Sequence, residues 1–181
     1  GGHMEIENER GKGFVPAILL TLVQQLNYTA REAEIALQSE ENGNKIAKLQ
    51  GFLAGVLEYK ETMAQSGYAL DEKYFSTQEC KIPYKNDDFA EGFAELRDIV
   101  SDIDDLTESP IYKSFTDKLA LCIEGRKNDL FHNSDKGRDL YFVKGWHKAI
   151  TKTSDTIDSL HALLDVMEKE KEETLPFGDE E

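Results

Sequence analysis

The chain has few cysteines, few prolines and no long hydrophobic run. Cys80 and Cys122 lie far apart and form no metal-binding spacing, which argues against a zinc site or a disulfide framework and favours a reduced, cytoplasmic setting. The longest apolar stretch, residues 14–23, contains Pro16 and Thr21 and is too short to span a bilayer. We therefore expect neither a disulfide-rich secreted domain nor a membrane protein.

Basic residues are scarce relative to acidic ones. The sequence holds 36 Asp and Glu against 21 Lys and Arg, which gives a formal net charge of −15. This charge opposes direct binding of nucleic acid or of anionic membranes, because both are themselves negatively charged. It favours a basic protein partner, and the apolar content of 39% is sufficient for a folded core.

Hydrophobic side chains recur every three or four residues through most of the chain, which is the spacing of amphipathic helices. The pattern predicts an all-α bundle of about five helices, made of two long αα-hairpins and a bridging helix, with no cofactor. The predicted segments are a tag remnant at 1–3, a single helical domain at 4–170 (hairpin 15–65, loop 66–87, helix 88–106, hairpin 110–169) and a disordered acidic tail at 171–181.

The predicted core faces of the second and last helices follow the same spacing. In the second helix they are Ile46, Leu49, Phe52, Leu53, Val56, Leu57, Tyr59 and Met63. In the last helix they are Leu140, Val143, Trp146, Ile150, Ile157, Leu160, Leu164 and Met167.

Glycine, proline and cap residues predict where the helices end. Gly43 is expected to be the left-handed residue that stops the first helix. Asn86 or Asp87 is expected to cap the helix at 88–106, and Ser109-Pro110 to open the next one.

Two glycines inside the second helix, Gly51 and Gly55, are expected to let a neighbouring helix approach closely. An offset of 94 residues lays the first hairpin over the second and places Gly51 on Gly145. This correspondence fits an internal repeat, and it fits equally two similar hairpins without common ancestry. In both cases the hairpins are expected to pack face to face as a four-helix bundle bridged by the helix at 88–106.

A stripe of acidic residues follows the helix at 88–106. Its members are Glu91, Glu95, Asp98, Asp102 and Asp105. They lie two positions behind an apolar seam that begins at Phe89 and Phe93, so about 200° separates the two faces. Like charges three or four residues apart repel, which favours a docking surface for a basic protein, and the alternative is an ordinary solvated face.

The segment from Arg126 to His132, with the sequence RKNDLFH, resembles the Arg-x(4–6)-His motif of HEPN ribonucleases, which are also helical bundles. The resemblance covers seven residues and implies a metal-independent ribonuclease, in which Arg126 and His132 act on the scissile phosphate and a 2′-hydroxyl. Lys127 stands where the family prefers a polar residue such as Asn. Six residues turn a helix by about 240°, so the pair shares a face only if the helix bends or ends between them.

Glu58-x-x-Glu61 and Glu95-x-x-Asp98 resemble the paired acids that bind Mg²⁺ in all-helical nucleotide pyrophosphatases of the MazG type. The resemblance implies a third function, metal-dependent nucleotide hydrolysis, with these four carboxylates as ligands. Such a site requires the carboxylates to converge with room for phosphate oxygens, whereas Glu95 and Asp98 belong to the stripe that we expect on the outer face.

The helical pairs that include Ser109-Pro110-Ile111-Tyr112 and the stretch Phe142-Val143-Lys144-Gly145-Trp146 resemble small all-helical proteins of tailed phages. This resemblance covers most of the C-terminal half and implies a virion component or a host-takeover protein in a bacterial cytoplasm. The tail segment 172–177 is similar to the peptide by which replication and repair proteins bind the bacterial sliding clamp, with Leu175 and Phe177 as anchors. The alternative for the tail is a free, solvated segment.

The sequence thus leads first to a non-enzymatic interaction protein that presents the acidic stripe to a basic partner. It is also expected to form homo-oligomers through exposed residues of the apolar seams. The ribonuclease and the pyrophosphatase stand as the two enzymatic alternatives.

Overall fold

The computed structural model of the chain describes residues 15–71, 88–132 and 137–174. These residues contain five helices and no β-strand, which confirms the predicted all-α class. The helices are α2 (Ala17–Leu37), α3 (Gly43–Gln65), α4 (Phe89–Glu108), α5 (Pro110–His132) and α6 (Gly137–Thr174). In the described ranges no helix combines the length and the apolar character needed to cross a membrane.

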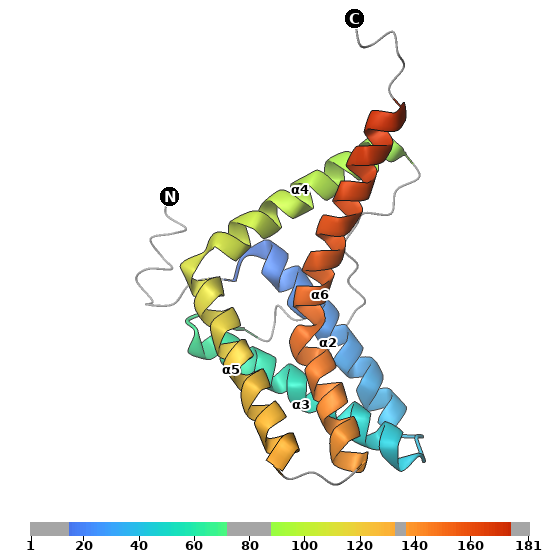
Figure 1. Cartoon of the computed structure of the whole chain (residues 1–181), viewed down its shortest axis with the longest axis vertical. Coiled ribbons are helices and arrows are strands. Elements are labelled where there is room, and N and C mark those ends of the chain that lie inside the picture. Colours follow the sequence, from blue (N-terminus) through green and yellow to red (C-terminus); the bar gives the residue numbers. More distant parts are fainter. Residues whose placement is uncertain (1–14, 72–87, 133–136, 175–181) are drawn as a thin grey trace, which may run out of the picture.

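The helices form two hairpins joined by α4, as Figure 1 shows. α2 and α3 are consecutive and pack together, and α6 runs across both of them. α4 lies at one end of the bundle, where it reaches from the C-terminal half of α6 to the start of α5. The predicted bridging position of this helix is therefore confirmed.

The most extensive helix contact, between α3 and α6, depends on three buried glycines. A Cβ atom at Gly51 would overlap the carbonyl oxygen of Phe142, and one at Gly145 would overlap the carbonyl oxygen of Lys48. A Cβ atom at Gly55 would lie 2.6 Å from the carbonyl oxygen of Trp146. Only residues without a side chain allow the two backbones to come this close, so the predicted close approach at Gly51 and Gly55 is confirmed.

The contacts across this crossing are reciprocal. The offset of 94 residues relates Gly51 to Gly145 and Lys48 to Phe142. Gly51 packs on the backbone of Phe142 and Gly145 packs on the backbone of Lys48, so the offset converts one contact into the other. The hydroxyls of Tyr59 and Thr153, also 94 residues apart, share a buried hydrogen bond of 2.7 Å. α3 and α6 thus pack with local two-fold symmetry, and common ancestry of the hairpins stays a prediction.

An aromatic cluster fills the space between α3 and α5. The ring of Phe115 is fully buried and meets the ring of Tyr59 edge to face, with centroids 5.0 Å apart. Tyr68 and Tyr112 contact the same ring at 6.1 and 5.8 Å. Such edge-to-face pairs add stability beyond the apolar area they bury, and here they fasten α5 to the end of α3.

The start of α3 differs from the prediction. Gly43 is the first residue of α3 rather than a left-handed stop, because Asn42 caps the helix with its side-chain oxygen on the backbone N–H groups of Asn44 and Lys45. The left-handed glycine lies at the other end of α3, where Gly67 has φ of 110°.

The chain after α3 closes a Schellman motif. Gly67 donates its backbone N–H to Ala64, and Tyr68 donates to Met63. The motif directs Tyr68 back into the aromatic cluster, where its ring is buried. Of the predicted loop 66–87, residues 72–87 lie outside the described part of the chain.

Two other boundaries required correction. Asp88, rather than Asn86 or Asp87, caps α4, since its carboxylate accepts from the N–H groups of Ala90 and Glu91. α6 continues to Thr174, so the first residues of the predicted tail are helical. Residues 175–181, which include the sliding-clamp-like anchors, lie outside the described residues, as does the predicted tag remnant.

Three large hydrophobic side chains assigned to the helix faces are exposed instead. Leu57 is 60% exposed, Leu140 41% and Phe89 40%. The remaining members of the two predicted core faces are buried or half-buried.

Candidate functional site

The acidic stripe lies on the solvent side of α4. All five of its side chains, Glu91, Glu95, Asp98, Asp102 and Asp105, are exposed. The opposite side of α4 is buried against the bundle through Phe93, Leu96, Val100, Ile103 and Leu106. The 200° separation read from the sequence therefore corresponds to an outer and an inner face, and the stripe rests on a well-packed helix.

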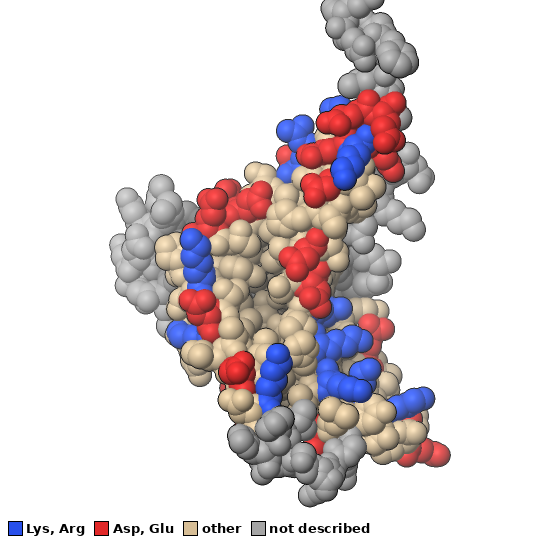
Figure 2. Space-filling view, viewed as in Figure 1, with Lys and Arg blue, Asp and Glu red and all other residues tan. Residues whose placement is uncertain are grey.

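Within the described part of the chain, few protein groups form salt bridges or hydrogen bonds with the carboxylates of the stripe. Within the described ranges, no salt bridge or hydrogen bond of the side chains of Glu95, Asp98, Asp102 or Asp105 is present. Figure 2 shows acidic side chains where α4 meets α5, and acidic side chains with some basic ones among them at the C-terminal end of α6. This end of the molecule therefore concentrates negative charge, and a basic surface would be attracted to it.

α4 is held in place on α6 by a histidine beside the stripe. His161 Nε2 lies 2.8 Å from the Asp104 carboxylate, and Nδ1 lies 3.1 Å from the Ile157 carbonyl oxygen. Both ring nitrogens face acceptors, so the doubly protonated imidazolium satisfies both contacts. The hydrogen bond to Asp104 is the main cause that raises the pKa of His161 above its ordinary value of 6.5.

The N-terminal end of α4 is covered by the last turns of α6. The Lys171 ammonium lies 5.0 Å from the centre of the Phe93 ring, and the Arg97 guanidinium lies 5.7 Å from it. These cation–π contacts are worth about 0.5–1 kcal/mol each at exposed sites. The contact of Lys171 joins α6 to α4 at the end where the stripe begins, and the contact of Arg97 lies within α4 itself.

The structure places Arg126, one of the two residues of the ribonuclease alternative, in a different setting. Its guanidinium lies 5.2 Å from the Trp146 ring and 5.8 Å from the Phe142 ring. α5 continues without interruption to His132, so the two residues stay about 240° apart around one helix axis. The His132 side chain lies outside the described residues. The geometry thus gives no shared face for RNA chemistry.

The four carboxylates of the pyrophosphatase alternative do not converge. Glu58 faces α6, and its carboxylate accepts a hydrogen bond of 2.6 Å from the Trp146 indole. Glu61, Glu95 and Asp98 are exposed on α3 and α4. Among the residues that the structure describes, no three His, Cys, Asp or Glu side chains are grouped closely enough to hold a metal ion. The described residues thus bring no such group of carboxylates together, and the magnesium site stays a prediction from the sequence.

Glu58 lies instead at the centre of a polar cluster that was not predicted from the sequence. Arg126 approaches its carboxylate to 4.0 Å while stacking over Trp146, so residues from α3, α5 and α6 meet there. Burial, followed by the neighbouring Glu58, raises the pKa of the Cys122 thiol, which therefore stays protonated and is a poor nucleophile. This cluster fastens three helices together rather than forming a reactive site.

No protein-family model matches the sequence, and no similar curated protein or solved structure was found. The resemblances to tailed-phage proteins, HEPN ribonucleases and MazG-type enzymes thus stay predictions from short stretches of sequence.

Proposed function

We propose that this protein is a non-enzymatic interaction module that docks a basic protein partner through the acidic stripe of α4. The observation that carries the proposal is the arrangement of five exposed carboxylates along one face of a helix whose other face is buried. From Glu91 to Asp105 the stripe extends about 21 Å at 1.5 Å per residue. That length matches about four turns of helix, or an extended basic segment of about six residues.

The stripe lowers the stability of the isolated protein. Like charges three or four residues apart on a helix cost a few tenths of a kcal/mol per pair. Asp105 also lies in the last turn of α4, where the helix dipole disfavours negative charge. A basic partner removes both penalties on binding, which supports a role for the stripe in recognition.

Charge complementarity of this kind acts mainly on the rate of association and on specificity. Exposed ion pairs are worth about 0.2–1 kcal/mol each and weaken as salt screens them. A complex formed through the stripe should therefore assemble quickly at low ionic strength and dissociate as salt is raised. The helix itself needs no rearrangement, because its inner face is already packed.

The test reverses two charges in the middle of the stripe. Glu95→Lys with Asp102→Lys replaces two attractive sites by two repulsive ones, a change of about 2 kcal/mol, or about 30-fold in affinity. Asp117→Lys with Glu124→Lys on α5 is the matched control, because these residues are also exposed and also seven positions apart. Both variants change the net charge equally.

Partners captured from extracts of the source cells by the wild-type protein are identified and then titrated against all three proteins at increasing salt. The control variant should keep its partner, and the stripe variant should lose it while retaining its helical circular-dichroism spectrum and cooperative unfolding. Undiminished binding of the same partner by the folded stripe variant at low salt would reject the stripe as the docking surface.

A further inference from the structure

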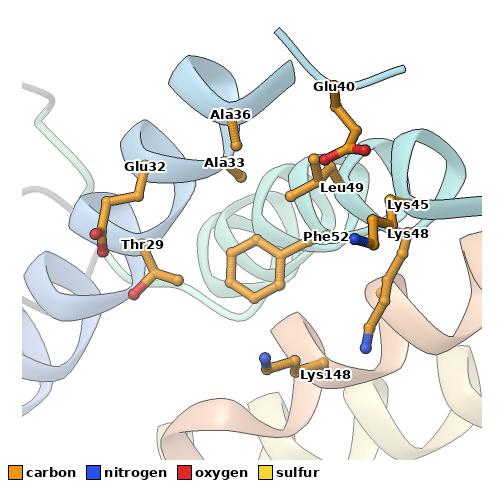
Figure 3. A pocket seen from close by; sticks show the side chains of 11 residues that line it. Thr29, Glu32, Ala33, Ala36, Glu40, Lys45, Lys48, Leu49, Phe52 and Lys148 are labelled. Atoms are coloured by element: carbon orange, nitrogen blue, oxygen red, sulfur yellow. The ribbon is translucent and has the colours of Figure 1, made fainter. Parts of the chain in front are cut away.

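A cavity of about 550 Å³ opens to solvent between α2, α3 and α6. It lies beside the glycine crossing, and Gly145 forms part of its wall. Its size is in the range of sites that bind small organic molecules. Figure 3 shows the side chains that line it, with the ring of Phe52 between α2 on one side and the lysines of α3 and α6 on the other.

Three lysines gather at this cavity. Lys45 and Lys48 lie one turn apart on α3, and Lys148 is carried in by α6 because Gly145 packs directly on the backbone of Lys48. In Figure 3 the Lys148 side chain extends below the ring of Phe52, and the Lys48 side chain extends from α3 toward α6. The close helix crossing thus brings together cations that lie about 100 residues apart in the chain.

In the part of the chain that the structure describes, these lysines form no ion pair, which is unexpected in a chain with an excess of acids. Within residues 15–71, 88–132 and 137–174, no salt bridge or hydrogen bond engages the ammonium of Lys45, Lys48 or Lys148. The carboxylates of Glu32 and Glu40 border the same cavity, but neither is within ion-pair distance of them. Three ammonium groups beside one cavity, none of them in an ion pair within the described residues, attract an anionic group, and the carboxylates of Glu32 and Glu40 at the same cavity reduce that attraction.

The remaining walls define the rest of the ligand. Ala33, Ala36, Leu49 and Phe52 form an apolar surface next to the lysines. Thr29 and Glu32 border the cavity from α2, on the side away from the lysines (Figure 3). A ligand that uses all three zones carries an anionic group at one end, a flat apolar ring in the middle and hydrogen-bond donors at the other end.

We infer that the cavity binds an aromatic phosphate monoester, the chemical class that includes the nucleoside monophosphates. The phosphate lies between Lys48 and Lys148, where a compact dianion interacts with two point charges. The ring covers the apolar wall formed by Leu49 and Phe52. The amino group of a base such as adenine is positioned to donate to Glu32. This site is separate from the acidic stripe and does not depend on the docking role of α4.

The experiment measures binding by isothermal titration and by chemical-shift changes of the full chain. The probes are AMP, phenyl phosphate, adenosine and inorganic phosphate. AMP is expected to bind most tightly, with phenyl phosphate weaker, and with adenosine and inorganic phosphate each at least about tenfold weaker than AMP, since each lacks one half of the ligand.

Lys48→Gln with Lys148→Gln should weaken AMP binding at least about tenfold. Lys113→Gln with Lys127→Gln on α5 is the control, because both of these lysines are exposed, away from the cavity, and the charge change is the same. Circular dichroism establishes that both variants are folded. Leu49→Ala, which removes apolar wall and keeps the lysines, should weaken AMP more than inorganic phosphate.

Three results would overturn the inference. The first is the absence of AMP binding at millimolar concentration. The second is equal affinity for inorganic phosphate and AMP, which would mean that the lysines attract any anion and that the apolar wall has no part. The third is unchanged AMP binding in the folded cavity variant, which would place the ligand elsewhere.

Discussion

Replacing Gly55 by alanine tests the physical basis of the α3–α6 crossing. The new Cβ atom would lie 2.6 Å from the Trp146 carbonyl oxygen and 2.7 Å from the Ala149 Cβ atom. Favourable contacts lie at about 3.5 Å or more, so the two helices must separate by about 1 Å. Neither neighbouring atom is the end of a flexible side chain, so the strain cannot be relieved by a rotamer change.

The expected loss of stability follows from two opposing effects. Overpacking of a tight core costs about 1–3 kcal/mol, and the upper part of that range applies here because the collisions involve backbone and a fixed Cβ atom. Alanine is the better helix former by about 1 kcal/mol, which offsets part of this cost. We expect the free energy of unfolding to fall by about 2 kcal/mol.

Gly125→Ala provides the matched control. Gly125 also lies inside a helix, and a Cβ atom built on it has no neighbour within 4 Å. The same substitution should therefore stabilise the protein by about 1 kcal/mol. In urea, with a dependence of about 2 kcal/mol per molar, the midpoint should fall by about 1 M for Gly55→Ala and rise by about 0.5 M for Gly125→Ala. A Gly55→Ala protein as stable as the wild type would refute the reasoning.

Two further substitutions probe contacts between distant segments. His161→Gln removes the contact between the imidazole and the Asp104 carboxylate. This contact stabilises the folded protein fully below pH 6.5, and its contribution is lost as the pH rises through the raised pKa of His161. Asp158 on α6 also raises this pKa. Urea unfolding should therefore show a deficit of about 0.2–1 kcal/mol at pH 5.5 that shrinks by pH 9, and a deficit that grows with pH would contradict the assignment. Tyr59→Phe removes the phenol that is hydrogen-bonded to the buried Thr153 hydroxyl and should lower the free energy of unfolding by about 1–2 kcal/mol. In a double-mutant cycle, Tyr59→Phe combined with Thr153→Val should lower it by less than the sum of the two single substitutions. Strict additivity would show that the two hydroxyls do not stabilise each other.

The features that were predictable from the sequence are those encoded locally. The spacing of apolar residues gave the helices, because an amphipathic helix is specified within its own segment. Ser109 and Pro110 marked the start of α5 for the same reason. The stripe on α4 was equally readable, since a seven-residue repeat fixes which side chains share a face.

Other features depend on contacts that no local pattern records. Asn42 and Gly43 fit both the end of one helix and the start of the next, and the hydrogen bonds of the Asn42 side chain decide between them. Leu57 follows the helical period of the core, but its side chain is exposed. The pairing of Glu58 with Trp146 joins segments 88 residues apart, and each residue had a different predicted role.

The cavity was missed for a similar reason. Lys45 and Lys48 were unremarkable in a helix with many polar residues, and Lys148 belongs to another hairpin. Their meeting depends on how closely α6 crosses α3, which is a property of Gly145 rather than of the lysines. The signal available in the sequence was the pair of glycines related by the offset of 94.

The crossing of α3 and α6 also constrains the order in which the chain can mature. Tyr59 and Thr153 are separated by 94 residues, so a nascent chain leaving the ribosome carries α3 with its glycine face open to water until α6 has emerged. α2 can cover only one side of α3 during that interval. The central interface therefore closes late, and no fragment that ends before α6 contains a completed core.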